Sequence, residues 1–163
     1  MIDPLTALGL LYDERGEHAL ATAAFERAQG IVRVNYGLRS LDQAPLIQQL
    51  IRGAEVRGYT ATAWYLEQEL LNLVRQNPDD LRTVPILHEL ADKRMEVLRR
   101  YDVGEELPLQ ITLGCYYKVN KSSDAESCYS GSKSDAIRSM LWETQAYYGI
   151  AINTLLKRKG LLE

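Results

Sequence analysis

The strongest structural signal in the sequence lies in residues 5–28. Small and apolar side chains recur there at helical spacing on both sides of Gly16. They occupy positions Leu8, Gly9, Tyr12, Ala21, Phe25 and Ala28. Small residues such as Gly9 and Ala21 let two antiparallel helices approach closely, while the larger side chains fill the remaining gaps. The pattern therefore predicts a helical hairpin that turns at Gly16.

The hairpin pattern returns 42 residues later. Gly58 follows Gly16 at this interval, and Ala63 follows Ala21. The same interval relates the further pairs Leu8–Leu50 and Ala28–Leu70. A fixed period of this size is typical of stacked helical repeats. The sequence therefore predicts at least two consecutive hairpins.

Helical periodicity and end signals predict an all-α chain that forms a single domain over residues 1–163. We expect helices at 4–14, 18–34, 43–57, 61–76, 84–101 and 135–158, the last within a C-terminal segment 134–159. Thr60, Thr83 and Ser134 are expected to cap their helices. Residues 102–133 are rich in Gly and Ser and are interpreted as an irregular loop, with a short apolar element at 109–117.

The last helix is expected to pack against the end of the repeat array and cover its apolar edge, as repeat proteins require. Its predicted apolar stripe consists of Ile137, Leu141, Tyr148, Ile152 and Leu155. Because adjacent tyrosines on a helix cannot both face the core, one of Tyr147 and Tyr148 is expected to pack and the other to reach solvent or a partner.

Length and charge restrict the class of protein. A chain of 163 residues is long enough for one ordinary core. A net charge of −3 argues against a general nucleic-acid binder. The sequence has no run of 18 apolar residues, so it predicts no membrane-spanning helix. The N-terminus has no signal-peptide pattern, so the protein is either cytosolic or a mature form from which an export signal has been removed.

Few residues suggest chemistry. His88 and Glu89 resemble the start of an H-E-x-x-H zinc motif, but Asp92 stands where the second histidine belongs. Cys115 and Cys128 form no C-x-x-C, and they are either two free thiols or one disulfide. We therefore expect no metal, no cofactor and no catalytic residues.

The first hairpin resembles the tetratricopeptide repeat, and the 42-residue interval resembles the longer version found in kinesin light chains. The second hairpin departs from the pattern at Ile51, Ala54 and Glu67. The chain is also similar to bacterial tetratricopeptide proteins of unassigned role, longer members of which carry export signals. This resemblance implies a periplasmic or secreted protein with a Cys115–Cys128 disulfide.

The resemblance also implies a function. In tetratricopeptide scaffolds the first helix of each hairpin lines a concave groove that holds a peptide or a partner helix. The matching positions here are Thr6, Leu10, Asp13, Gln48, Arg52 and Glu55, followed by His88 and Asp92 on the fifth helix. We therefore expect a non-enzymatic protein-interaction scaffold that binds a protein or peptide, or a second copy of itself in a homodimer. The alternative is a small-molecule-binding or enzymatic helical domain that uses the tyrosine-rich loop 115–129.

Overall fold

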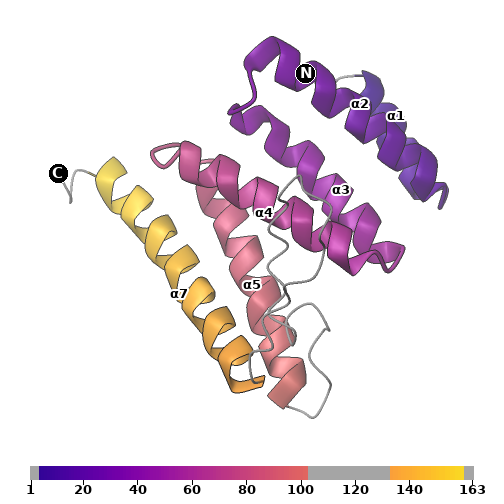
Figure 1. The fold of residues 1–163 in the computed structure, drawn as a ribbon. Coiled ribbons are helices and arrows are strands. Elements are labelled where there is room, and N and C mark those ends of the chain that lie inside the picture. The colour runs from indigo at the N-terminus through magenta and orange to yellow at the C-terminus, as the bar shows by residue number, and fades with distance from the viewer. Residues whose placement is uncertain (1–3, 103–132, 160–163) are drawn as a thin grey trace, which may run out of the picture. The chain divides into compact units, whose positions relative to one another are not determined.

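The structure is a computed structural model, and it describes residues 4–102 and 133–159. All regular elements in these residues are helices (Figure 1). Contacts divide the chain into two compact units, residues 1–78 and residues 79–163. The boundary falls within Asn77-Pro78-Asp79, which the sequence marks as a helix stop.

The first unit consists of two helical hairpins. α1 (Pro4–Glu14) pairs with α2 (His18–Tyr36), and α3 (Ala44–Val56) pairs with α4 (Thr60–Gln76). α2 also packs against α3, which joins the hairpins (Figure 1). A short 3-10 helix, Leu41–Gln43, precedes α3 and was not predicted. The predicted all-α class is confirmed, and the helix bounds agree with the predicted ones to within two residues.

The two hairpin turns have the same geometry at the predicted interval. Gly16 and Gly58 both adopt a φ of 75°, a conformation that favours glycine. In each turn the glycine N–H donates to the carbonyl three residues earlier at 2.9 Å. The next N–H, from Glu17 or Tyr59, donates to the carbonyl five residues earlier. The 42-residue repeat is therefore present in the backbone as well as in the sequence.

The core of the first unit explains why Gly9 is small. The buried members of one cluster are Ala21, Phe25, Ala28, Leu46 and Leu50. A Cβ added at Gly9 would lie 2.5 Å from Cε1 of the Phe25 ring. The ring thus occupies the space that a larger side chain on α1 would need. Gly9 permits the close contact between the helices of the first hairpin, as predicted.

A polar network ties the linker between the hairpins to the helices around it. Gln43 is only 1% exposed, and its Nε2 donates to the carbonyl oxygens of Gly37, Leu38 and Ser40. Its Oε1 accepts from Arg33 Nε at 2.7 Å, and Arg33 also pairs with Glu69 of α4. These bonds attach the buried Gln43 side chain to three linker carbonyls, two of which, those of Gly37 and Ser40, also accept backbone N–H groups.

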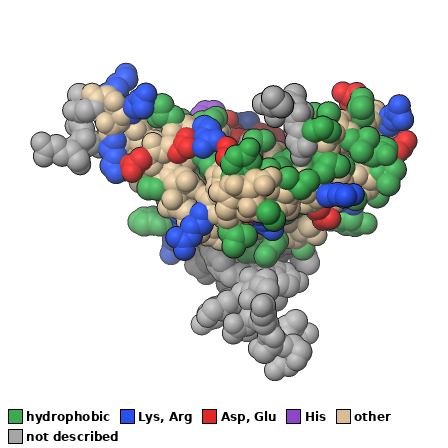
Figure 2. All heavy atoms as spheres, turned by 90° about the horizontal axis from the view of Figure 1, so that it is seen from above, with side chains coloured by type: hydrophobic (Ala, Val, Ile, Leu, Met, Phe, Trp, Pro, Cys, Tyr) green, Lys and Arg blue, Asp and Glu red, His purple; other side chains and the backbone are tan. Residues whose placement is uncertain are grey.

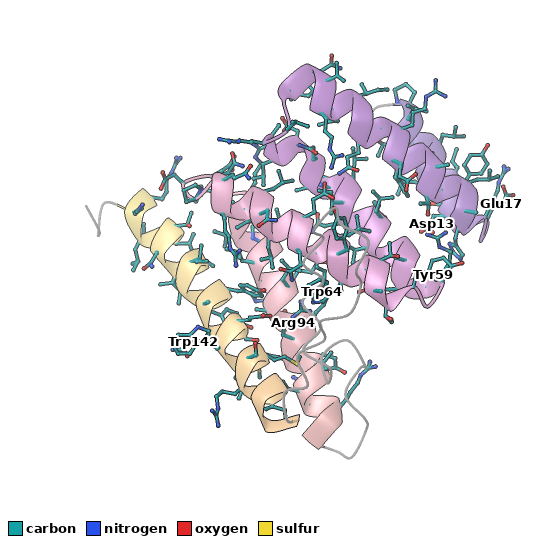
Figure 3. The ribbon with its side chains drawn as sticks, in the orientation of Figure 1. Asp13, Glu17, Tyr59, Trp64, Arg94 and Trp142 are labelled. Atoms are coloured by element: carbon teal, nitrogen blue, oxygen red, sulfur yellow. The ribbon has the colours of Figure 1, made fainter. Side chains whose placement is uncertain are left out.

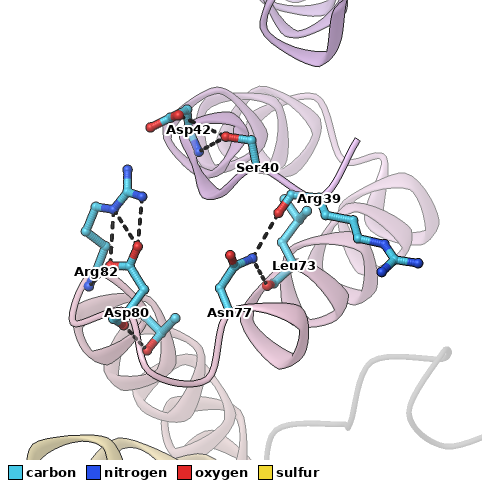
Figure 4. Close-up of polar contacts among 8 residues, drawn as sticks. Arg39, Ser40, Asp42, Leu73, Asn77, Asp80 and Arg82 are labelled. Atoms are coloured by element: carbon cyan, nitrogen blue, oxygen red, sulfur yellow. Dashed lines mark hydrogen bonds and ion pairs between the residues drawn. The ribbon is translucent and has the colours of Figure 1, made fainter. Parts of the chain in front are cut away.

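Figure 4 shows three further hydrogen bonds at the ends of the linker and of α4. Asn77 Nδ2 donates to the carbonyls of Arg39 at 2.9 Å and Leu73 at 2.8 Å. Ser40 Oγ accepts from the backbone N–H of Asp42 at 3.2 Å, so it caps the 3-10 helix. Asn77 therefore stops α4 and anchors the preceding linker at the same time.

The outer face of the first hairpin carries exposed apolar side chains. Leu8 is 40% exposed and Leu11 is 52% exposed. Their equivalents 42 residues later, Leu50 and Gly53, are buried in the second hairpin. Leu20 and Ile31 on α2 are exposed as well. Figure 2 shows apolar side chains among the charged ones on one face of the molecule.

The second unit contains α5 (Thr83–Asp102) and α7 (Lys133–Arg158), which pack against each other. Lys157 lies 3.2 Å from Asp79, whereas Tyr148 bonds to Asp92 farther along α5, so the helices run antiparallel. The core residues of α5 are Ile86, Leu87, Leu90 and Ala91.

The start of α5 is held by short-range contacts. Thr83 Oγ1 donates to the Asp80 carbonyl at 2.7 Å. The Asp80 carboxylate accepts from the Arg82 side chain and from its backbone N–H (Figure 4). The hydrogen bond from the Arg82 side chain lowers the pKa of Asp80, and the backbone bond adds to the effect.

α5 begins at Thr83 itself, and α4 likewise begins at Thr60, where Tyr59 precedes it without a side-chain cap. The predicted caps at these two threonines are therefore wrong by one residue.

The predicted apolar stripe of α7 is not its buried face. The residues buried on α7 are Met140, Thr144, Tyr147, Ala151 and Thr154. Leu141, Ile152 and Leu155 of the predicted stripe are instead 44% to 54% exposed. Thr144 and Thr154 are tolerated inside because each hydroxyl donates to the carbonyl four residues earlier. As predicted, one of the paired tyrosines packs, since Tyr147 is 4% exposed and Tyr148 is half-buried.

Candidate functional site

Six of the predicted groove residues lie in the first unit, on α1 and α3. α3 has seven buried residues on one side, including Leu46, Ile47 and Leu50. Arg52 and Glu55 are exposed on its other side, and Gln48 is half-buried. α3 therefore presents a polar side, with Gln48, Arg52 and Glu55, opposite to its buried one.

Asp13 of α1 and Arg52 of α3 approach each other on this face. Asp13 Oδ2 lies 3.8 Å from Arg52 Nη2. Asp13 Oδ1 lies 2.8 Å from Nδ1 of His18, the second residue after the first turn. The Asp13 side chain is 15% exposed, whereas that of Arg52 is 67% exposed. Because most of the Arg52 side chain is exposed, it remains accessible to a ligand although it lies near Asp13.

The other α1 positions are less open. Leu10 is half-buried and packs against the core cluster that contains Phe25 and Leu50. Thr6 is also half-buried. Leu10 thus serves mainly the packing between the hairpins, and the accessible part of the face lies on α3.

Two features near this face were missed by sequence reasoning. The Arg57 guanidinium lies 4.9 Å from the centre of the Tyr59 ring, and Tyr59 is 55% exposed at the second turn. Figure 3 shows Asp13 and Tyr59 at the same end of the first unit. Gln49 has a buried Oε1 that accepts no hydrogen bond within the described part of the chain. Neither feature follows from a helical pattern, because each depends on how side chains meet in three dimensions.

His88 and Asp92 belong to the second unit, where they form a cluster with Tyr148. His88 Nδ1 lies 3.0 Å from Asp92 Oδ2, and the Tyr148 hydroxyl donates to Asp92 Oδ1 at 3.0 Å. The His88 and Tyr148 rings meet edge to face at 6.1 Å. The hydrogen bond to Asp92 raises the pKa of Tyr148. Tyr148 is therefore a neutral donor near pH 7 and is poorly suited to act as a base or nucleophile.

Other predicted features lie outside the described residues. Cys115, Cys128 and the tyrosine-rich loop 115–129 all fall there. Within residues 4–102 and 133–159, no group of three or more His, Cys, Asp or Glu side chains could hold a metal ion. Over the same ranges, no helix is both long and apolar enough to cross a bilayer.

Comparison with known proteins gives no assignment. The chain matches no family model, no curated protein and no solved structure.

Proposed function

We propose that the first unit is a tetratricopeptide-like, non-enzymatic scaffold that binds a peptide or a partner helix on the face formed by α1 and α3. The proposal is supported most directly by the Asp13–Arg52 pair, which joins equivalent helices of two repeated hairpins. The core uses the other side of α3, and the Arg52 side chain is 67% exposed, so its guanidinium is accessible for recognition.

The chemistry of the face favours a ligand with polar and charged groups. Arg52 supplies a planar guanidinium that can bind a carboxylate in a bidentate manner. Glu55, one turn along α3, supplies the opposite charge. An extended peptide or helix that carries both charge signs would match this arrangement. His88 and Asp92 are proposed as further partner contacts, on the second unit.

Affinity capture with a charge-reversal variant tests the proposal. The wild-type chain, Arg52→Glu and the control Arg75→Glu would be immobilised and exposed to an extract of the native host. Arg75 is an exposed arginine near the end of α4 and matches Arg52 in charge change. We expect one partner to be recovered by the wild-type chain and by Arg75→Glu, and lost with Arg52→Glu.

Two results would contradict the proposal. Equal recovery of the partner by all three chains would place its binding site elsewhere. A purified metabolite that raises the melting temperature, with no protein recovered by any chain, would favour the small-molecule alternative. Circular dichroism of each variant controls for loss of fold, which is not expected because both arginines are exposed.

A further inference from the structure

α1 exposes an apolar row on the side away from the proposed binding face. We call this row, which consists of Pro4, Leu8 and Leu11, the outer row of α1, and all three residues are exposed. Leu8 follows Thr6 by two residues, which corresponds to about 200° around a helix, so the outer row and the predicted groove residues of α1 lie on opposite sides. A repeat whose outer side stays in water is normally polar on that side. An apolar outer row therefore indicates that another element covers it.

The second hairpin shows what the equivalent row contacts. The positions 42 residues after the outer row are Leu46, Leu50 and Gly53, and all three are buried. The two leucines belong to the core cluster that contains Phe25 and Ala28 of α2. A Cβ added at Gly53 would lie 3.7 Å from Oγ1 of Thr22, also on α2. In the second hairpin this row is therefore covered by α2.

The contact between α2 and α3 also gives the direction of the covering helix. Thr22, near the start of α2, faces Gly53 near the end of α3. Arg33, near the end of α2, bonds to Gln43, which directly precedes α3. α2 therefore runs antiparallel to α3, and a helix that covers α1 in the same way runs antiparallel to α1.

Two positions of the outer row restrict the side chains of the covering helix. Leu8 has the same side chain as Leu50, so the same partners, an aromatic ring and an alanine, suit it. Leu11 stands where the second hairpin has Gly53, whose position leaves room only for ordinary van der Waals contact with Thr22. A leucine fills this space, so the covering helix needs a residue smaller than threonine there.

We propose that the outer row of α1 binds a helix of a partner protein, with the two helices antiparallel. That helix carries Ala or Gly, an aromatic residue and Ala at intervals of three residues, in the places that Thr22, Phe25 and Ala28 occupy in α2. α2 of a second copy does not meet this need, because Phe25 is 2% exposed and Ala28 is 0% exposed within their own chain. The outer row spans about 10 Å of helix, so the contact belongs to the weak, reversible class.

A synthetic peptide with the α2 sequence, residues 17–37, is the probe for the full chain, because α2 covers the equivalent row. Fluorescence anisotropy of the labelled peptide should show saturable binding to the wild-type chain. Thr22→Ala in the peptide should lower the dissociation constant at least about threefold, since it makes room for Leu11. With Leu11→Ala in the full chain, the two peptides should differ by less, because the crowding side chain is gone. This comparison controls for the higher helix propensity of alanine in the peptide.

Leu8→Glu in the full chain should raise the dissociation constant of the peptide at least about tenfold, because it places a charge against apolar side chains. Leu81→Glu is the matched control, since it makes the same substitution at a 38% exposed leucine of the second unit, and it should bind the peptide as the wild-type chain does. Circular dichroism confirms that each variant is helical.

Three results would overturn the proposal. The first is a wild-type chain that shows no saturable binding of either peptide. The second is equal binding of the peptide by Leu8→Glu and Leu81→Glu. The third is self-association of the wild-type chain in sedimentation velocity that Leu8→Glu abolishes, because a second copy would then cover the outer row of α1.

Discussion

At the scale of single residues, small side chains decide how closely the helices approach. Gly9 faces the Phe25 ring, which is 2% exposed and held within the first core cluster. Gly→Ala in a helix normally stabilises a protein by about 0.5–1 kcal/mol, because glycine loses more conformational freedom on folding. At Gly9 the added methyl group has no room, since the ring cannot move without disturbing its neighbours.

We therefore expect Gly9→Ala to lower the free energy of unfolding by about 1–3 kcal/mol, as overpacking does. Gly30→Ala is the matched control, because a Cβ there meets no atom within 4 Å. It should leave stability unchanged or raise it. Urea unfolding of both variants measures the difference. If Gly9→Ala were as stable as Gly30→Ala, the result would contradict the close contact between Gly9 on α1 and Phe25 on α2.

Tyr148 gives a prediction about pH. The hydrogen bond to Asp92 favours the neutral phenol, so the pKa of Tyr148 lies above its ordinary value of 10.0. A raised pKa means that this bond contributes stability below the ordinary pKa and that the contribution is lost as pH rises through the raised value. NMR titration of ¹³Cζ-labelled tyrosine should show this pKa, and Asp92→Asn should lower it. A Tyr148 pKa that is unaffected by Asp92→Asn would contradict the contact.

At the scale of elements, the helices were predictable and the buried face of α7 was not. Helix ends are marked in the sequence by residues such as Gly16, Gly58 and Pro78, which act locally. The face of a helix depends on its neighbour. On α7 the close contact with α5 uses Ala151 and two threonines, whereas sequence reasoning selected the larger Leu and Ile side chains. A threonine that bonds to its own helix appears polar in the sequence but is easily buried.

The linker between the hairpins depends on Gln43. Its side chain makes three hydrogen bonds to linker carbonyls and accepts one from Arg33. Gln43→Ala would remove all four hydrogen bonds of a side chain that is only 1% exposed, and we expect it to lower the free energy of unfolding by about 1–3 kcal/mol. Gln76→Ala, exposed at the end of α4, should change it by less than about 0.5 kcal/mol. If chemical denaturation gave the same change in the free energy of unfolding for Gln43→Ala and Gln76→Ala, the hydrogen bonds of Gln43 would not stabilise the linker.

At the scale of the whole molecule, the sequence predicts a repeat more readily than a recognition site. The 42-residue interval identifies both turns, because each turn requires glycine at a positive φ. The Asp13–Arg52 pair has no such signal, since its members are 39 positions apart and meet only when the hairpins pack. The resemblance to tetratricopeptide repeats selected both residues as groove positions, but only the packed structure gives the distance between their side chains.

The division into two units makes a prediction about folding. The first core cluster lies entirely within residues 1–78, so a fragment with these residues should be helical and unfold cooperatively. Its small size makes it less stable than an ordinary domain. Phe25→Ala should lower the free energy of unfolding of this fragment by about 3–5 kcal/mol and abolish its cooperative melting. Leu38→Ala is the control: because Leu38 is 75% exposed, this variant should keep cooperative melting. A fragment without helical circular dichroism would show that the first unit depends on the second.

Site-specific photo-crosslinking tests most directly whether a partner binds the proposed face. A benzophenone amino acid would be placed at Gln48, on the face formed by α1 and α3, and at Asn72, on the exposed side of α4. We predict a crosslinked partner at Gln48 that disappears when Arg52→Glu is added, and no crosslink at Asn72. A partner crosslinked at Asn72 and absent at Gln48 would contradict binding on the face formed by α1 and α3.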